Sequence, residues 1–122
     1  MSVYKNDRTA EDIKREITAV IRELKDPRVA GKMLTVVRVE LANDLSFGKV
    51  YISAFDSIAT AREAVKGLEH AQGLIRREIC SRLHLRKAPE LKFIADDSVR
   101  EGIELFRKYD MAKKDVKHED ND

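Results

Sequence analysis

A break between two predicted helices, followed at once by a basic segment, is the part of this chain best suited to chemistry. The break is Ala71-Gln72-Gly73, in which small residues flank one variable position. Glycine has no Cβ, so a partner can approach the backbone closely at Gly73. The helix that restarts there presents unpaired N–H groups and the positive end of its dipole, with Arg76 and Arg77 beside them. Phosphate oxygens fit such a geometry, and the segment therefore predicts RNA binding.

The charge of the chain is concentrated rather than large. The 122 residues carry a formal net charge of only +2, yet residues 71–92 hold six basic residues against two acidic ones. A local basic patch binds phosphate even where the net charge is small. The residues predicted to bind RNA are Ala71, Gly73, Arg76, Arg77, Arg82, Arg86 and Lys87.

Nothing in the sequence indicates catalysis, a metal or a cofactor. The three histidines, His70, His84 and His118, are scattered and lack the pairing with acids or cysteines that metal or nucleophile chemistry requires. Cys80 is the only cysteine, which excludes an intrachain disulfide and favours the reducing cytoplasm. Residues 1–8 lack the apolar core of a signal peptide, and no run approaches membrane-spanning length. We expect a non-catalytic cytoplasmic protein without membrane association.

Apolar residues at helical spacing predict the helices that position the basic segment. These helices cover about residues 9–25, residues 60–70, the stretch after the Ala-Gln-Gly break, and residues from 98 onward. In the helix after the break, Ile75, Ile79 and Leu83 face the core, and that orientation turns Arg77 toward solvent. The residues of the last helix that we expect to face the core are Val99, Ile103 and Phe106.

Alternating polar and apolar residues predict three strands. Residues 34–41 and 49–54 form an antiparallel hairpin around a turn at 43–46, and residues 91–95 form a short third strand. In the first strand the residues expected to face the core are Thr35, Val37, Val39 and Leu41. One-sided alternation means that helices cover only one face of the sheet. The open face is then predicted to carry Arg38, Lys49 and Tyr51.

The two ends of the chain are predicted to lie outside the folded domain. Residues 1–7 are expected to be a flexible N-terminus, and residues 8–109 a single domain. Residues 110–122 are expected to be a polar, disordered tail, because helical periodicity is lost over residues 113–122.

The predicted order, αββααβ plus a C-terminal helix, resembles type II KH domains, an α+β fold with a three-stranded sheet. In those domains the helix–helix junction is ordinarily Gly-x-x-Gly, whereas here it is Ala-x-Gly. Eight short motifs in order and at the right spacing resemble the bacterial ribosome-binding factor A family over roughly residues 8–107. The motifs are Asp26-Pro27-Arg28, Thr35-Val36, Asp44-Leu45, Lys49-Val50-Tyr51-Ile52-Ser53, Ala71-Gln72-Gly73, Leu85-Arg86, Pro89-Glu90-Leu91 and Asp96 through Gly102.

The resemblance implies an assembly factor that binds the free small (30S) ribosomal subunit late in its maturation. It also implies a link to processing of the 5′ end of precursor 16S rRNA and to the 5′ terminal helix, release by a ribosome-assembly GTPase, and importance for growth in the cold. We expect such a factor to act as a monomer.

Two other functions remain open on the sequence. An α+β module can bind a protein through its open sheet face, with the arginines serving only solubility. A KH-like domain can also bind short single-stranded RNA. Base stacking has little support, however, because tryptophan is absent and Tyr51 is the one aromatic expected to face outward.

Overall fold

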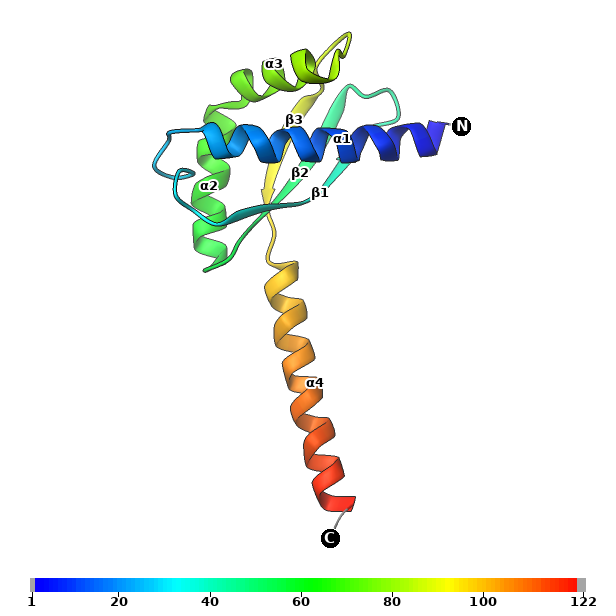
Figure 1. The fold of residues 1–122 in the computed structure, drawn as a ribbon, viewed down its shortest axis with the longest axis vertical. Coiled ribbons are helices and arrows are strands. Elements are labelled where there is room, and N and C mark those ends of the chain that lie inside the picture. The colour runs from blue at the N-terminus through cyan, green and yellow to red at the C-terminus, as the bar shows by residue number, and fades with distance from the viewer. Residues whose placement is uncertain (1, 121–122) are drawn as a thin grey trace.

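The computed structural model describes residues 2–120, with side chains for residues 8–112. Figure 1 shows helices gathered around a sheet and a C-terminal helix that projects away from it. The elements in chain order are α1 (Ser2–Glu23), β1 (Leu34–Leu41), β2 (Phe47–Ala54), α2 (Ile58–His70), α3 (Gln72–Leu83), β3 (Glu90–Ala95) and α4 (Ser98–Asp120). The predicted α+β class and the predicted order of elements are confirmed.

The sheet is mixed, with the strand order β1-β2-β3. β1 and β2 pair antiparallel, as the predicted hairpin requires, and β2 pairs with β3 in parallel. A parallel pair needs a long crossover, and α2 and α3 together supply it. The junction between these two helices therefore lies within the crossover, and α3 leads directly into the edge strand β3.

A single apolar core lies between the helices and one face of the sheet. Ile13, Ile17 and Val20 from α1 pack in this core with Ile75 and Ile79 from α3. The sheet contributes buried residues from all three strands, namely Val36, Val50, Ile52, Leu91 and Phe93. On the opposite face Arg38 and Lys49 are exposed, as expected where helices cover only the other face of the sheet.

The predicted facing of β1 is wrong at its start. Thr35 was expected in the core but is exposed, whereas Val36 is buried. A β-bulge between Val36 and Arg38 shifts the register there. Because side chains alternate along a strand, one inserted residue reverses which of them face the core. Beyond the bulge Val39 is half-buried and Arg38 is exposed, as predicted.

Helices extend further at both ends than the sequence pattern predicts. α1 begins at Ser2 rather than near Thr9, and α4 continues to Asp120 rather than ending near Tyr109. Neither extension contains a proline, and an established helix propagates readily through charged residues. The predicted flexible N-terminus and disordered tail are thus helical in backbone over residues 2–7 and 110–120. Residues 1, 121 and 122 lie outside the described residues.

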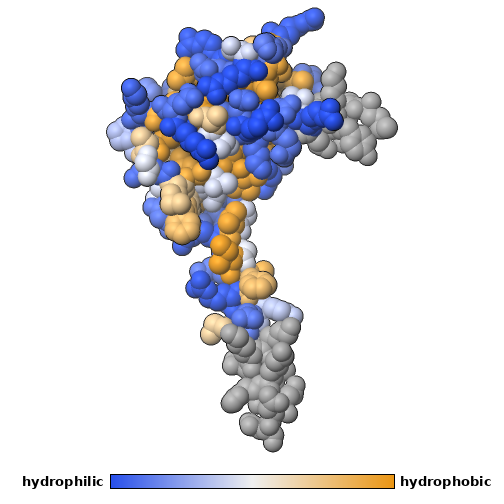
Figure 2. All heavy atoms as spheres, in the orientation of Figure 1, coloured by the Kyte–Doolittle hydropathy of each residue, from blue (hydrophilic) through white to orange (hydrophobic). Residues whose placement is uncertain are grey.

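The expectation that α4 packs into the core is also wrong. Its apolar residues Val99, Ile103 and Phe106 are 48%, 55% and 71% exposed. The helix leaves the sheet after Asp96 and Asp97 and points away from the core, which α1, α2 and α3 already cover (Figure 1). Apolar side chains therefore line its surface (Figure 2). No helix in residues 2–120 combines the length and the apolar character that crossing a bilayer requires.

Candidate RNA interface

The junction between α2 and α3 is a sharp joint with open space beside it. Ala71 ends α2 and begins α3 with φ −90° and ψ 9°, and its side chain makes no capping hydrogen bond to the new helix. Gly73 is exposed, and a Cβ placed on it would meet no atom within 4 Å. Packing among the described residues therefore does not require glycine at this position. The space beside Gly73 is free for a partner to approach the first turn of α3.

Gln72, the central residue of the junction, binds the edge strand β3 through a hydrogen bond. Its Oε1 accepts a hydrogen bond from the backbone N–H of Leu91 at 3.1 Å, and its Nε2 donates to Glu69 Oε2 at 2.8 Å. Glu69 Oε1 in turn accepts from the N–H of Phe93 at 2.9 Å. β3 lacks a neighbouring strand on this side, and these two side chains supply acceptors in its place. Sequence reasoning missed this pair, since helical spacing carries no signal for contacts with a strand some twenty residues away.

The side chain of Arg76 makes its hydrogen bonds within the protein. Its guanidinium donates from Nε to the carbonyl of Pro89 at 3.0 Å and from Nη2 to the carbonyl of Ala88 at 3.1 Å. The side chain is half-buried. The arginine therefore ties α3 to the loop that leads into β3.

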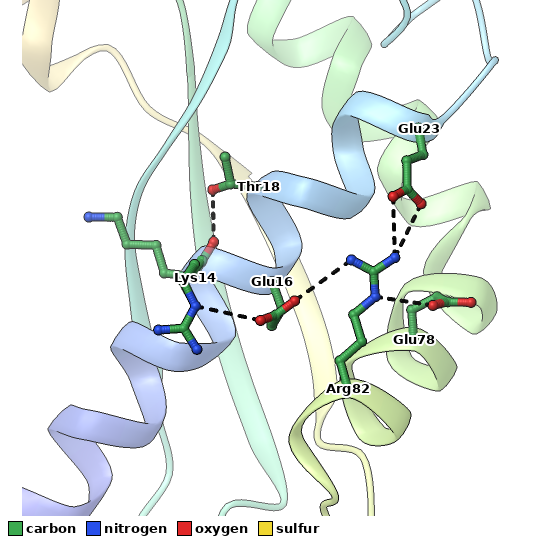
Figure 3. A network of polar contacts seen from close by, with 7 residues as sticks. Lys14, Glu16, Thr18, Glu23, Glu78 and Arg82 are labelled. Atoms are coloured by element: carbon green, nitrogen blue, oxygen red, sulfur yellow. Dashed lines mark hydrogen bonds and ion pairs between the residues drawn. The ribbon is translucent and has the colours of Figure 1, made fainter.

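Arg82 is enclosed by carboxylates and joins α3 to α1 (Figure 3). Its guanidinium lies 3.2 Å from Glu23, 3.2 Å from Glu78 and 3.7 Å from Glu16. The hydrogen bond with Glu23, and then that with Glu78, raises the pKa of Arg82. Three acidic neighbours leave little positive potential for a phosphate at this side chain.

The other basic residues of the segment face solvent. Arg77 lies on the outer side of α3, as predicted, while Arg86 and Lys87 lie on the loop between α3 and β3. Within residues 8–112 the side chains of Arg77 and Arg86 have no hydrogen bond or ion pair. The pKa of Asp44 is lowered mainly by hydrogen bonds from Ser46 and to a small extent by the charge of Lys87. This loop thus lies near the turn of the β1–β2 hairpin. We call Arg77, Arg86 and Lys87 the free basic set.

The end of α3 fixes the start of that loop. His84 takes the left-handed conformation, with φ 54° and ψ 43°, and its N–H bonds to the carbonyl of Cys80. The N–H of Leu85 bonds to the same carbonyl at 3.0 Å, and Cys80 Sγ donates back to the carbonyl of Leu85 at 3.0 Å. His84 and Cys80 therefore form the hydrogen bonds that end α3. No group of three or more His, Cys, Asp or Glu side chains in the described part of the chain is placed to hold a metal ion.

The open sheet face carries an internal polar network. The guanidinium of Arg38 lies 3.9 Å from the centre of the Tyr51 ring, and it pairs with Asp96 at 3.7 Å. The hydroxyl of Tyr51 donates to Glu40 at 2.6 Å, and this bond raises the pKa of Tyr51. Lys49 is exposed beside them. One face of the Tyr51 ring is thus covered by Arg38, and acidic groups lie among the basic ones.

A family model described as Ribosome-binding factor A matches residues 5–108, and the resemblance seen in the sequence motifs is thereby confirmed. Ribosome-binding factor A of Treponema denticola is 42% identical over 110 residues, which cover 88% of this chain and 83% of that protein.

Solved structures of the same kind are similar to this fold. The crystal structure of ribosome-binding factor A from Thermus thermophilus gives a TM-score of 0.65 at 29% identity, covering 74% of this chain and 93% of that one. A homology model of the Thermus thermophilus factor, fitted into the cryo-EM map of a 30S complex, gives a TM-score of 0.57 at 30% identity, covering 70% and 89%. The chain therefore belongs to the ribosome-binding factor A family.

Proposed function

We propose that this protein is a non-catalytic assembly factor that binds the free small ribosomal subunit through its 16S rRNA. Family membership carries the proposal, and a Thermus thermophilus relative has been fitted into the map of a 30S complex. The structure adds a surface of suitable chemistry in the free basic set and the open space at Gly73.

The proposed mechanism is noncovalent. The sugar–phosphate chain approaches the first turn of α3 beside Gly73, where N–H groups and the helix dipole favour an anion. Arg77, Arg86 and Lys87 then neutralise phosphates along α3 and the loop that follows it. Such contacts position the protein on folded RNA without reading its sequence, so the shape of the rRNA is the feature recognised.

The same proposal extends to the role that the family resemblance implies. The factor acts as a cytoplasmic monomer late in subunit maturation, near the 5′ terminal helix, and promotes processing of the 16S rRNA 5′ end. A ribosome-assembly GTPase releases it. Growth in the cold depends on it because misfolded rRNA helices escape more slowly at low temperature, so a ligand that favours one conformation gains importance.

Sedimentation of the purified protein with free small subunits, large subunits and whole ribosomes tests the proposal. Selective co-migration with small subunits is expected, and it should be lost in an Arg77→Glu, Arg86→Glu double variant. Arg62→Glu is the matched control, because Arg62 is an exposed arginine on α2 away from the free basic set. Equal binding to all three particles, or binding that resists high salt, would instead favour a general RNA binder or a protein-interaction module.

A further inference from the structure

We infer that Arg76 is a positioning residue, which holds the loop of residues 84–90 so that Arg86 and Lys87 meet phosphate, and that Arg76 does not itself contact RNA. The inference rests on the proposed function, because it assigns a role within the same surface. It also changes the role that the sequence suggests for Arg76, which is direct phosphate contact.

The geometry of Arg76 is that of a fork closed on two consecutive carbonyls. Nε donates to Pro89 and Nη2 donates to Ala88, at 3.0 and 3.1 Å. A planar guanidinium presents two parallel donors in this way, whereas a lysine ammonium is a single point charge on a flexible stem. Pro89 is buried, so its carbonyl needs a donor from within the protein, and Arg76 supplies that donor.

Both ends of the loop are tied to the body of the protein. At its start, Leu85 exchanges hydrogen bonds with Cys80. At its end, the N–H of Glu90 donates to the carbonyl of Ser46 at 3.0 Å. Between these ties Arg76 fixes Ala88, the residue that follows Lys87. Arg86 and Lys87 are thus the exposed basic residues of a short loop held on both sides.

Such an arrangement matters for binding because ordering a loop during association opposes binding. A loop that is already held in place loses little further freedom when its side chains meet phosphate. Without Arg76, residues 86–88 would sample more conformations, and Arg86 and Lys87 would reach the phosphates less often.

A double-mutant cycle on binding to purified free small subunits tests this role. Arg76→Lys keeps the charge but loses the fork, and we expect it to weaken binding about tenfold. In an Arg86→Gln, Lys87→Gln background the same change should have almost no further effect, because the residues that it positions are gone. Near-normal binding by Arg76→Lys would show that the guanidinium fork is not needed to position the loop, and losses that add would show that Arg76 acts independently of Arg86 and Lys87. Either result would overturn the inference.

Tryptic cleavage of the native protein gives a second readout that needs no RNA. Trypsin cuts after Arg86 and Lys87, and Arg76→Lys should speed cleavage at these bonds several-fold while the melting temperature shows that the protein remains folded. Arg77→Gln is the control and should leave the cleavage rate unchanged. An unchanged rate in Arg76→Lys would contradict the inference. If the wild-type protein fails to bind small subunits, the proposed function is wrong, and so is the proposed role of Arg86 and Lys87 in RNA contact. The cleavage result still decides whether Arg76 orders the loop.

Discussion

Gln72 and Leu91 are joined by a hydrogen bond of 3.1 Å, from the backbone N–H of Leu91 to the side-chain Oε1 of Gln72. This bond fixes the centre of the Ala-Gln-Gly junction to the edge of the sheet. Gly73, the next residue, has empty space where a Cβ would lie. The junction is therefore rigidly held on one side and accessible on the other, which is the arrangement that a preformed binding surface requires.

Replacement of Gly73 by alanine should separate stability from binding. Gly73→Ala is expected to leave the free energy of unfolding unchanged or to raise it by up to about 1 kcal/mol, because alanine favours the helix and meets no neighbour. Binding to small subunits should nevertheless weaken about tenfold, since the methyl group holds the RNA backbone away. Urea unfolding and co-sedimentation measure the two effects.

Gly67 provides the contrasting substitution on the neighbouring helix. A Cβ there would lie 2.8 Å from Val29 Cγ2, so Gly67→Ala should destabilise the fold by about 1–3 kcal/mol.

Normal small-subunit binding by Gly73→Ala would mean that RNA does not approach the backbone at the α2–α3 junction.

Loss of the acceptors on the β3 edge should destabilise the fold. Gln72→Ala and Glu69→Ala each leave a strand N–H without its acceptor, at Leu91 and Phe93, which are only 2% and 3% exposed. A buried donor without a partner costs about 1–3 kcal/mol. Urea unfolding should show that loss, whereas Arg62→Ala on the exposed side of α2 should change stability by less than about 0.5 kcal/mol. Equal stability of all three variants would show that water replaces the two acceptors.

Much of the fold follows from local patterns in the sequence. The hairpin, the crossover helices and the solvent-facing position of Arg77 are each a consequence of periodicity and turn residues near one another in the chain. What could not be predicted depends on contacts between distant residues. The bulge at Val36 depends on pairing with β2, and the exposure of Ile103 depends on α1 to α3 having already covered the core face.

The candidate site shows the same division. Composition identifies the basic segment and helical spacing places Arg77 on the solvent side, but neither shows which groups of the protein bind Arg76 and Arg82. Arg82 pairs with Glu23, which lies 59 positions earlier in the chain. Arg76 donates hydrogen bonds to carbonyls of the loop that follows α3. Only the folded chain therefore shows that Arg76 and Arg82 have partners within the protein.

The salt dependence of binding should distinguish these two classes of arginine. Each phosphate contact contributes about 0.7–0.9 to the slope of log K against log salt concentration. Single changes to glutamine at Arg77, Arg86 and Lys87 should each lower that slope by about this amount. Arg82→Gln should leave the slope unchanged and lower the midpoint of urea unfolding instead, because Arg82 pairs with Glu16, Glu23 and Glu78. A lower slope for Arg82→Gln with an unchanged slope for Arg77→Gln would reverse the assignment.

The loop after α1 should contribute stability that depends on pH. Hydrogen bonds from the side chain and backbone of Arg28 lower the pKa of Asp26 from 3.8 to about 2. A carboxyl that is more acidic in the folded chain than in the unfolded chain stabilises the fold when it is ionised. This stabilisation is present above about pH 4, and it is lost as the pH falls from about 4 to 2.

Asp26→Asn removes that titration. Urea unfolding should therefore show the variant to be less stable than the wild type at neutral pH, with the difference shrinking as the pH falls from about 4 toward 2. A difference that stays constant over this range would show that the ion pair with Arg28 does not set the effect.

Cross-linking from α3 within the small-subunit complex tests whether this helix lies against 16S rRNA. A photo-reactive amino acid in place of Arg77 is compared with the same group in place of Arg62, both positions being exposed. Labelling of 16S rRNA from position 77, with little from position 62, is the predicted result. Labelling of ribosomal protein alone from position 77, or equal labelling from both positions, would rule out α3 as the surface that contacts rRNA.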